Sequence, residues 1–500
     1  MKNMLIPITD LRTDGIELDA LVAEMGVFGM SEVESNAIKK HIKKFLNEMR
    51  DDLLVVKESN YVDRAYRDSY YDYYSTKLRS YNRNCVRLSF FDSGVDADFL
   101  LDNANSIKNY YLGFLVLRPQ QKCIGRNVIS PMAMKVPQQI LVCKARIDSS
   151  CYGIKLEADG FPHASQDAET MTCAQTTIWM LMEYFGNKYS CYHPTVSSEI
   201  ERILTPFVFE RQLPSRGLTY NQVSVALREF GLGTKIYGLP QNFTADQQAH
   251  FNELLACYIE SGVPLAIALT GNGNGHAVVC EGREDIDKRE VVKRSQNVNG
   301  KTIYSWNDTV ANSKFIFNDD NFPCYQSDSL KKPCERYLKL KRPDLASMQI
   351  CQFIAPLYNK VYMDADMAVG ESKQMITKMI PNTDGCVIRT LLTSSRTFRE
   401  HIAHLGSFTD GQRKALLKIP MPKFIWLTEV STLDQFYHNK VRAMLLLDAT
   451  GSPKSHASQN LVFMLADGVY HYYNSLSMKT ESRKTSFANV FECFVGNLKK

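Results

Sequence analysis

The sequence has no long apolar run and no large excess of charge, and each absence argues against a class of protein. No window approaches the ~20 apolar residues of a membrane-spanning helix, and the stretch from Met1 to Pro7 lacks the apolar core of a secretory leader. We therefore expect neither membrane insertion nor secretion. The 59 basic and 54 acidic residues leave a formal charge of only +5. This dispersed excess gives no reason to expect nucleic acid as a partner.

The sequence also lacks paired cysteine motifs. Its 13 cysteines are odd in number and scattered, and no two of them form a Cys-x-x-Cys pair. In a chain without a secretory leader, such cysteines indicate reduced thiols in a cytoplasmic protein and not a disulfide framework or a zinc knuckle. Most of them are expected to be small buried residues. We expect no metal ion and no organic cofactor.

The length and patterning predict an α+β protein with three regions. A chain of 500 residues exceeds the size at which a single core stops growing. Residues 1–158 combine helical and strand patterns and form an N-terminal α/β region, and residues 159–345 contain well-marked helix starts and apolar strands. Residues 346–500 form a mixed, mainly-β region. Residues 283–312 are polar and charged, which is typical of an exposed hairpin or insertion.

Cys173 opens a strongly apolar helix in the central region. After Cys173, apolar residues recur along one face of the helix, and further apolar residues broaden that face. We therefore expect the helix to lie in a core. Thr170 or Thr172 provides the cap, so Cys173 lies in the first turn. The free N–H groups and the dipole at a helix N-terminus favour a thiolate, which is the nucleophilic form of cysteine. The same N–H groups can form part of an oxyanion hole.

Two later strands bring residues that would complete a nucleophilic site. His276 follows a glycine-asparagine turn and opens an apolar strand, where it can act as the base for Cys173. The next strand-like stretch ends in Asn318, Asp319 and Asp320, any of which can orient the imidazole. Taken singly, each of these residues is more often structural: an inert buried thiol, a core histidine or a polar turn.

The order of these elements resembles the papain-like cysteine peptidase superfamily. The likeness is greatest to the branch of bacteriocin leader-processing (double-glycine) peptidases and covers the central region only. It rests on Gln166, Cys173 and three segments: Gly262-Val263-Pro264, Gly275-His276-Ala277-Val278-Val279 and Asn318-Asp319. The resemblance implies Cys173 as nucleophile, His276 as base, Asp319 as orienting carboxylate and Gln166 as oxyanion donor. It also implies a papain-like domain whose nucleophile begins a buried helix packed on an antiparallel sheet.

The leading functional expectation is a thiol hydrolase that cleaves a peptide or isopeptide bond of a protein or peptide substrate through an acyl-enzyme. Two alternatives remain. The acyl group can pass to an amine, as in papain-like transglutaminases and acyltransferases, or a glutamine can be deamidated. A third reading is a catalytically inactive papain-like module that acts as a binding scaffold between the flanking regions. Thiol reactivity separates this scaffold from the enzymes.

Overall fold

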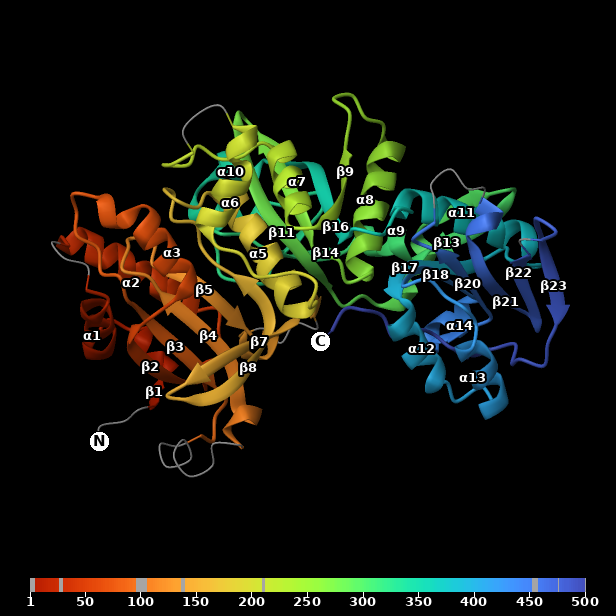
Figure 1. Ribbon diagram of the computed structural model, residues 1–500, viewed down its shortest axis with the longest axis horizontal. Coiled ribbons are helices and arrows are strands. Elements are labelled where there is room, and N and C mark those ends of the chain that lie inside the picture. Colours follow the sequence, from red (N-terminus) through yellow and green to blue (C-terminus); the bar gives the residue numbers. More distant parts are fainter. Residues whose placement is uncertain are drawn as a thin grey trace.

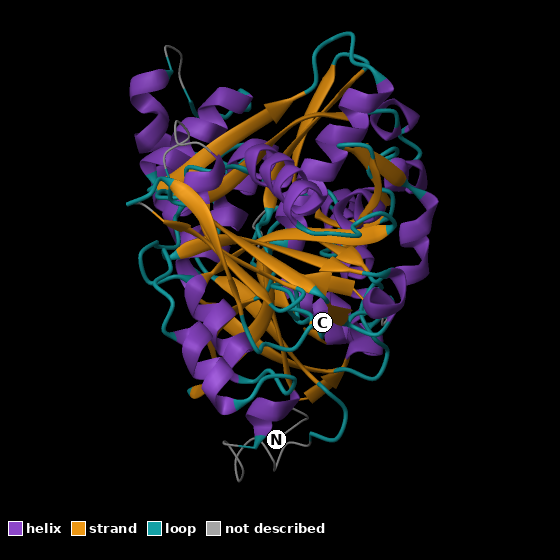
Figure 2. Cartoon of the chain, turned by 90° about the vertical axis from the view of Figure 1, so that its right-hand side faces the viewer, coloured by secondary structure: helices purple, strands orange, loops and turns teal. Residues whose placement is uncertain are grey.

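The protein is a mixed α+β structure built around three sheets. The computed structural model describes residues 5–26, 30–95, 106–135, 140–208, 212–451, 457–474 and 476–499. Helices make up 34% of the chain and strands 33%, which confirms the expected mixture of α and β. The three sheets follow one another along the longest axis of the molecule (Figure 1), and helices lie on both sides of the strands (Figure 2).

The first sheet belongs to the N-terminal part of the chain, and all its pairings are antiparallel. Every residue of Cys85–Phe91 is buried, so both faces of the sheet are covered at its middle. Its order is β1-β2-β3-β4-β5-β8-β7. The strands are β1 (Leu5–Pro7), β2 (Leu54–Tyr61), β3 (Cys85–Phe91), β4 (Tyr111–Leu117), β5 (Ile124–Ile129), β7 (Ala145–Cys151) and β8 (Ile154–His163).

The second sheet is also antiparallel and lies at the centre of the molecule (Figure 1). Its order is β15-β14-β11-β10-β16-β9, and β6 pairs with β11. Neighbouring residues of β11 point to opposite faces, so Val278 packs in one core and Val279 in another. The strands are β6 (Ile140–Val142), β9 (Leu232–Gly238), β10 (Leu265–Gly271), β11 (Asn274–Glu284), β14 (Lys314–Asn318), β15 (Gln326–Ser329) and β16 (Gln349–Tyr358).

The third sheet occupies the C-terminal end of the molecule. Its order is β12-β13-β17-β18-β20-β21-β22-β23, with a parallel pairing between β13 and β17. The strands are β12 (Ser295–Val298), β13 (Lys301–Ser305), β17 (Cys386–Ser394), β18 (Phe424–Ser431), β20 (Ala443–Asp448), β21 (Leu461–Ala466), β22 (Val469–Asn474) and β23 (Lys479–Lys484), and β19 (Lys440–Val441) pairs separately with β24 (Phe491–Glu492).

Two helices join the sheets: α5 packs against β7, β8 and β11, and α8 contacts β10, β11 and β17. Each therefore lies between two sheets, which explains why α5 is buried on all sides from Ala174 to Phe185 and α8 is buried from Phe251 to Glu260 except at Asn252. The α-helices are α1 (Ile16–Glu24), α2 (Glu32–Leu46), α3 (Arg64–Asp72), α5 (Cys173–Lys188), α6 (Ser197–Leu204), α7 (Tyr220–Glu229), α8 (Ala245–Glu260), α9 (Trp306–Ala311), α10 (Pro343–Ala346), α11 (Ala365–Met379), α12 (Ser395–Ala403), α13 (Asp410–Leu417) and α14 (Leu433–Tyr437).

Four strands do not follow the regional boundaries expected at residues 158 and 345. Strand β6 comes from the first region and β16 from the third, yet both pair in the central sheet. Strands β12 and β13 come from the middle region and join the third sheet. The expectation of an exposed segment over residues 283–312 is wrong for α9, whose residues are all buried. Sheet membership depends on distant pairing partners, which local polarity does not reveal.

Within the part of the chain that the structure describes, no helix combines the length and the apolar character needed to cross a membrane.

Candidate active site

The loop before α5 is fixed by one carboxylate. Asp167 Oδ1 accepts hydrogen bonds from the backbone N–H groups of Glu169, Thr170 and Met171, at 2.9, 2.8 and 2.8 Å. Three backbone donors on one oxygen hold the chain in a compact turn just before the helix. Asp167 thereby sets where Cys173 begins α5.

Thr172 is the residue that caps this helix, one of the two candidates expected from the sequence. Its backbone N–H donates to Gln175 Oε1 at 3.0 Å, and Gln175 Nε2 donates to Ser215 Oγ at 2.5 Å. Cys173 is the first residue of α5 and is half-buried. The N–H groups of a first helical turn have no acceptor within the helix, so they face this thiol as an anion-binding end.

His276 lies near the start of β11, beyond a tight hairpin turn. Asn272 and Gly273 connect β10 to β11, both with positive φ (50° and 75°), as a two-residue hairpin of this hand requires. His276 Nε2 lies 3.0 Å from Asp319 Oδ1. The Cys173 side chain neighbours the imidazole and contributes to the raised pKa of His276. Because Nε2 faces the carboxylate, Nδ1 is the ring nitrogen left for the thiol.

Asp319 directly follows β14 and is completely buried. Its Oδ2 accepts from Arg336 Nη2 at 2.6 Å and Arg336 Nε at 3.1 Å, and the Tyr337 hydroxyl donates to both oxygens at 3.0 and 3.2 Å. The backbone N–H of Asn321 donates to Oδ1 at 3.0 Å. Every lone pair that faces the protein is thus satisfied, which fixes the carboxylate against the imidazole.

The charges of His276 and Asp319 stabilise each other. Burial alone would lower the pKa of His276, but the Asp319 carboxylate, its hydrogen bond to the ring and the neighbouring Cys173 side chain hold it well above its ordinary value. Burial would raise the pKa of Asp319, and the neighbouring His276 and Arg336 cations instead lower it. At neutral pH the pair is therefore an imidazolium and a carboxylate. An imidazolium beside Cys173 is the setting that favours a thiolate.

Asn318 and Asp320, the other two candidates for orienting the ring, do not form the hydrogen bond that Asp319 makes. The Asn318 side chain accepts the backbone N–H of Tyr325 at 3.0 Å and, among the described residues, has no hydrogen bond with His276. Asp320 Oδ1 lies 3.7 Å from His276 Nε2, and its Oδ2 is buried without a partner among the described residues. Burial raises the pKa of Asp320 to about 7. Asp319 is therefore the residue that bonds the ring, and Asp320 is a second, weaker neighbour.

Gln166, the expected oxyanion donor, lies on the carboxylate side of the site. Its Nε2 donates to Asn321 Oδ1 at 3.2 Å and approaches Asp320 Oδ1 at 3.5 Å. The Gln166 amide thus reaches the loop that carries Asp319. In this arrangement its N–H groups donate to Asn321 and Asp320. A role as oxyanion donor stays a prediction and requires the amide to leave these partners.

The first sheet supports the loop from behind. His163, on β8, is fully buried; its Nε2 lies 3.3 Å from the Asp319 carbonyl oxygen and its Nδ1 lies 3.0 Å from Asn127 Nδ2. Burial lowers the pKa of His163 to about 4, so the ring is neutral and can donate to that carbonyl. Lys44 Nζ, from α2, donates to the Asn321 carbonyl at 2.8 Å. The N-terminal region therefore helps to place Asp319.

His276, Asp319 and Asp320 also bring three potential metal-binding atoms within 4.8 Å of one another. Both oxygens of Asp319 already accept hydrogen bonds, and the Arg336 guanidinium lies against Oδ2. A cation at this position would meet that positive charge at short range. The donor set suits an ion pair better than a metal ion.

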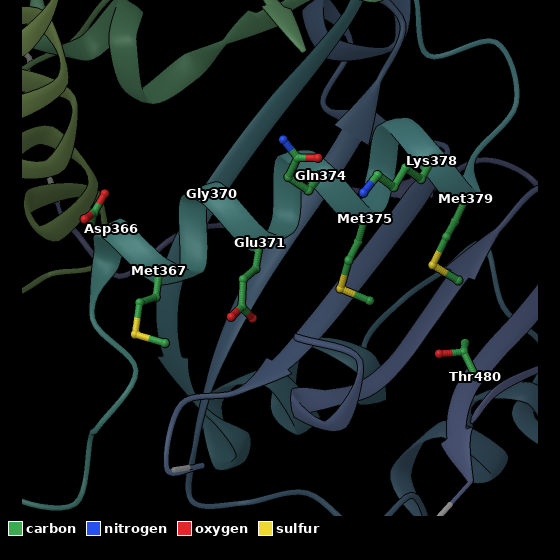
Figure 3. Close-up of a pocket in the computed structure, with 9 residues that line it drawn as sticks. All are labelled: Asp366, Met367, Gly370, Glu371, Gln374, Met375, Lys378, Met379 and Thr480. Atoms are coloured by element: carbon green, nitrogen blue, oxygen red, sulfur yellow. The ribbon is translucent and has the colours of Figure 1, made fainter. Parts of the chain in front are cut away.

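A separate hollow of about 580 Å³ lies against α11 in the C-terminal part, away from these residues. Figure 3 shows Met367, Glu371, Met375 and Met379 on one side of α11, the side on which Thr480 of β23 lies. No cysteine or histidine lines it. It offers an apolar surface and no nucleophile with a base.

No family model matches the chain, and no curated protein matches it significantly. The structure brings the expected Cys173, His276 and Asp319 together and adds residues that the sequence reasoning missed: Arg336, Tyr337, Asn321, Asp167 and His163. Arg336 and Tyr337 lie in a short 3₁₀ helix, Glu335–Leu340, whose pattern carries no catalytic signature.

Proposed function

We propose that this chain is a cysteine hydrolase with a papain-like central region, which cleaves a peptide or isopeptide bond of a protein substrate through an acyl-enzyme on Cys173. The observation that carries the proposal is the contact of Cys173 with His276 and of His276 with Asp319. These residues come from three separate parts of the chain: Cys173 and His276 are 103 positions apart, and Asp319 lies 43 positions further on. A thiol, a base and an orienting carboxylate in series form the arrangement that nucleophilic catalysis needs.

In the proposed reaction the Cys173 thiolate attacks the carbonyl carbon of the scissile bond. The N–H groups at the start of α5 stabilise the oxyanion of the tetrahedral intermediate. The His276 imidazolium gives its proton to the departing amine, which leaves a thioester on Cys173. Neutral His276 then takes a proton from water, the resulting hydroxide attacks the thioester, and the acid product and the thiol are released. Asp319 stays ionised throughout and holds the ring in place.

The other two readings predict different products from the same protein. Transfer of the acyl group to an amine yields a crosslink or a conjugate, and deamidation of glutamine adds about one mass unit to the substrate. Neither changes the number of peptide bonds. A binding scaffold leaves all substrates unchanged. Mass spectrometry of a candidate substrate therefore separates cleavage from the alternatives.

The proposal is tested by alkylation with iodoacetamide in mild acid, followed by peptide mapping. We expect Cys173 to be modified selectively, because a helix N-terminus and a neighbouring imidazolium favour the nucleophilic form of a thiol. The Cys173→Ala protein should lose this labelling and any peptide cleavage. His276→Ala should slow both by about 100-fold or more.

Cys191 supplies the matched control, because it is exposed and lies outside the site. We expect Cys191→Ala to leave the rapid labelling and the cleavage unchanged. If Cys173 were labelled in mild acid no faster than Cys191, the hydrolase would be rejected and the scaffold favoured. Cleavage that survives Cys173→Ala would likewise reject the proposal.

A further inference from the structure

One face of α2 forms a lysine-lined hollow, and one of its lysines, Lys44, contacts the loop that carries Asp319. The hollow measures about 500 Å³ and is lined by Lys39, Lys40, Lys43 and Lys44, with Asp14 and two asparagines. Two of these lysines are neutralised, since Lys39 pairs with Asp19 at 2.5 Å and Lys43 with Asp14 at 2.6 Å. Among the described residues, no ion pair involves Lys40 or Lys44, although the nearby Asp319 and Glu48 carboxylates raise the pKa of Lys44 against its burial.

Lys44 and Lys122 lie next to the loop that carries Asp319 and Asp320. Lys44 Nζ donates to the carbonyl of Asn321, two residues beyond Asp319, and lies 4.1 Å from the centre of the Phe322 ring. Lys122, between β4 and β5, directly follows Gln121, whose carbonyl oxygen lies 3.0 Å from His41 Nδ1 of α2. Its positive charge acts on the nearby Asp320 carboxyl. No ion pair within the described part of the chain involves Lys122 either. We define Lys40, Lys44 and Lys122 together as the basic surface.

The dimensions of the hollow suit an extended peptide. Its lining runs along α2 from Asn36 to Asn47, which corresponds to about 16 Å of helix at 1.5 Å per residue. An extended chain covers that length with about five residues. None of the lining residues is aromatic, whereas sites for single-stranded nucleic acid combine positive charge with aromatic stacking surfaces. The lining therefore favours a polypeptide over RNA or DNA.

We propose that the basic surface binds an acidic segment of the protein substrate, about five residues long, and so presents the neighbouring acyl bond to Cys173. This rests on the proposed hydrolase function. Opposite charge raises the rate of encounter and selects among substrates. The mechanism gives the N-terminal region a role in recognition, in addition to its contacts with the catalytic loop.

Binding is measured in the Cys173→Ala protein by fluorescence anisotropy with two fluorescein-labelled decapeptides, one containing five consecutive glutamates and one with glutamines in their place. We expect the glutamate peptide to bind at least about tenfold more tightly at 50 mM salt, and the preference to fade as salt screens the charges. The double variant Lys40→Gln, Lys122→Gln should remove about tenfold of this affinity. Lys44 is left intact because it contacts the catalytic loop.

The matched control is Lys414→Gln with Lys418→Gln. These exposed lysines lie in and just after α13, at the other end of the molecule (Figure 1). Their substitution removes the same net charge as the Lys40 and Lys122 double variant. The proposal is overturned if the two peptides bind equally, if the control variant weakens binding as much, or if a decamer of oligouridine competes as well as the glutamate peptide. The anisotropy signal does not depend on catalysis. Selective labelling of Cys173 without acidic-peptide binding would thus reject the basic surface alone, and the reverse result would reject the hydrolase.

Discussion

Strand β11 carries an ionisable side chain near each end, and the protein surrounds the two in opposite ways. His276, near the start, faces the fully buried Asp319 carboxylate, which has cationic and hydroxyl partners. Glu281, five residues along the same strand, is also fully buried, but neither carboxyl oxygen has a hydrogen-bond partner among the described residues. Burial alone raises the pKa of Glu281 well above its usual value.

The comparison shows that burial does not decide whether a carboxyl group is charged. Both groups lose their water, which disfavours the ionised form. Asp319 regains that free energy from Arg336 and His276, and stays an anion. Glu281 has thiols and a phenol as neighbours, including Cys143, Cys280 and Tyr325, and stays a neutral acid. A difference in partners at the two ends of one strand thus separates the proposed active site from an inert core.

The strongest way to break this contrast is to remove the cation from the reactive end. Arg336→Met leaves Asp319 and Asp328 without the guanidinium that both contact. A buried charge that loses its partner costs about 3–5 kcal/mol, so we expect the free energy of unfolding to fall by that amount at pH 7. The pKa of Asp319 should also rise toward that of Glu281. Urea denaturation measures the stability.

Arg342→Met is the control for this prediction. Arg342 lies six residues after Arg336 in the sequence and pairs with Asp344 at 2.7 Å on the surface. The Arg342 side chain is 53% exposed. Its loss should leave the urea midpoint almost unchanged. Adding Asp328→Asn to Arg336→Met should recover part of the loss, because Arg336 is the only cation paired with Asp328 among the described residues, whereas Asp319 keeps His276. Equal midpoints for Arg336→Met and the wild type would show that the guanidinium is not what keeps Asp319 ionised.

The local patterns at the reactive end were enough to predict its main residues. Helix capping and apolar periodicity predict α5 and the place of Cys173, and the glycine-asparagine turn predicts the strand that carries His276. The polar ending of β14 predicts that Asp319 stands at a strand terminus. Such features depend on neighbours in the sequence, so they can be recognised without a structure.

The partners of these residues could not be predicted in the same way. Arg336 reaches Asp319 from a short 3₁₀ helix, and His163 reaches it from another sheet. The neutral environment of Glu281 arises where β6, from the first region, joins β11 of the central sheet. Each contact depends on long-range pairing, about which hydrophobic periodicity says nothing. The position of Glu281 within an apolar strand of the sequence gives no indication of whether its carboxyl group is ionised.

The inert end is tested by Glu281→Gln, which removes the titration and keeps the shape. In the wild type, the unfolded carboxyl ionises above pH 4.5 whereas the folded one keeps its proton. Glu281 therefore costs no stability below that pH, and the free energy of unfolding falls as the pH rises above it. The glutamine protein has no such slope. We expect its stability relative to the wild type to grow by about 1.4 kcal/mol per pH unit above 4.5, until the folded carboxyl ionises.

The measurement is urea denaturation from pH 4 to 7, and its reading is the slope of the difference, because a buried amide carries its own desolvation cost. Glu157→Gln is the control, since Glu157 is exposed on β8 and should show no pH-dependent difference. A flat difference for Glu281→Gln would mean that Glu281 is ionised in the folded protein. The contrast along β11 would then disappear.

The smallest effect is expected for Asp320, which lies between the two extremes. It is buried and has a partnerless oxygen like Glu281, yet it lies 3.7 Å from His276 Nε2. With its pKa raised to about 7 by burial, Asp320 gains a negative charge as the pH passes neutrality. That charge favours the imidazolium form of His276 and delays loss of its proton. Asp320→Asn removes this support, so the proton should leave about one pH unit earlier.

The measurement for Asp320→Asn is the rate of Cys173 alkylation as a function of pH. In the proposed ion pair, a second rise in rate marks the loss of the His276 proton, and the midpoint belongs to the coupled group of His276, Asp319 and Asp320. This midpoint should move to lower pH in Asp320→Asn and stay in place in the surface variant Asp344→Asn. A midpoint equal to that of the wild type would show that Asp320 keeps its proton throughout. Asp320 would then belong with Glu281 as a neutral buried acid, and Asp319 alone would hold the charge of His276.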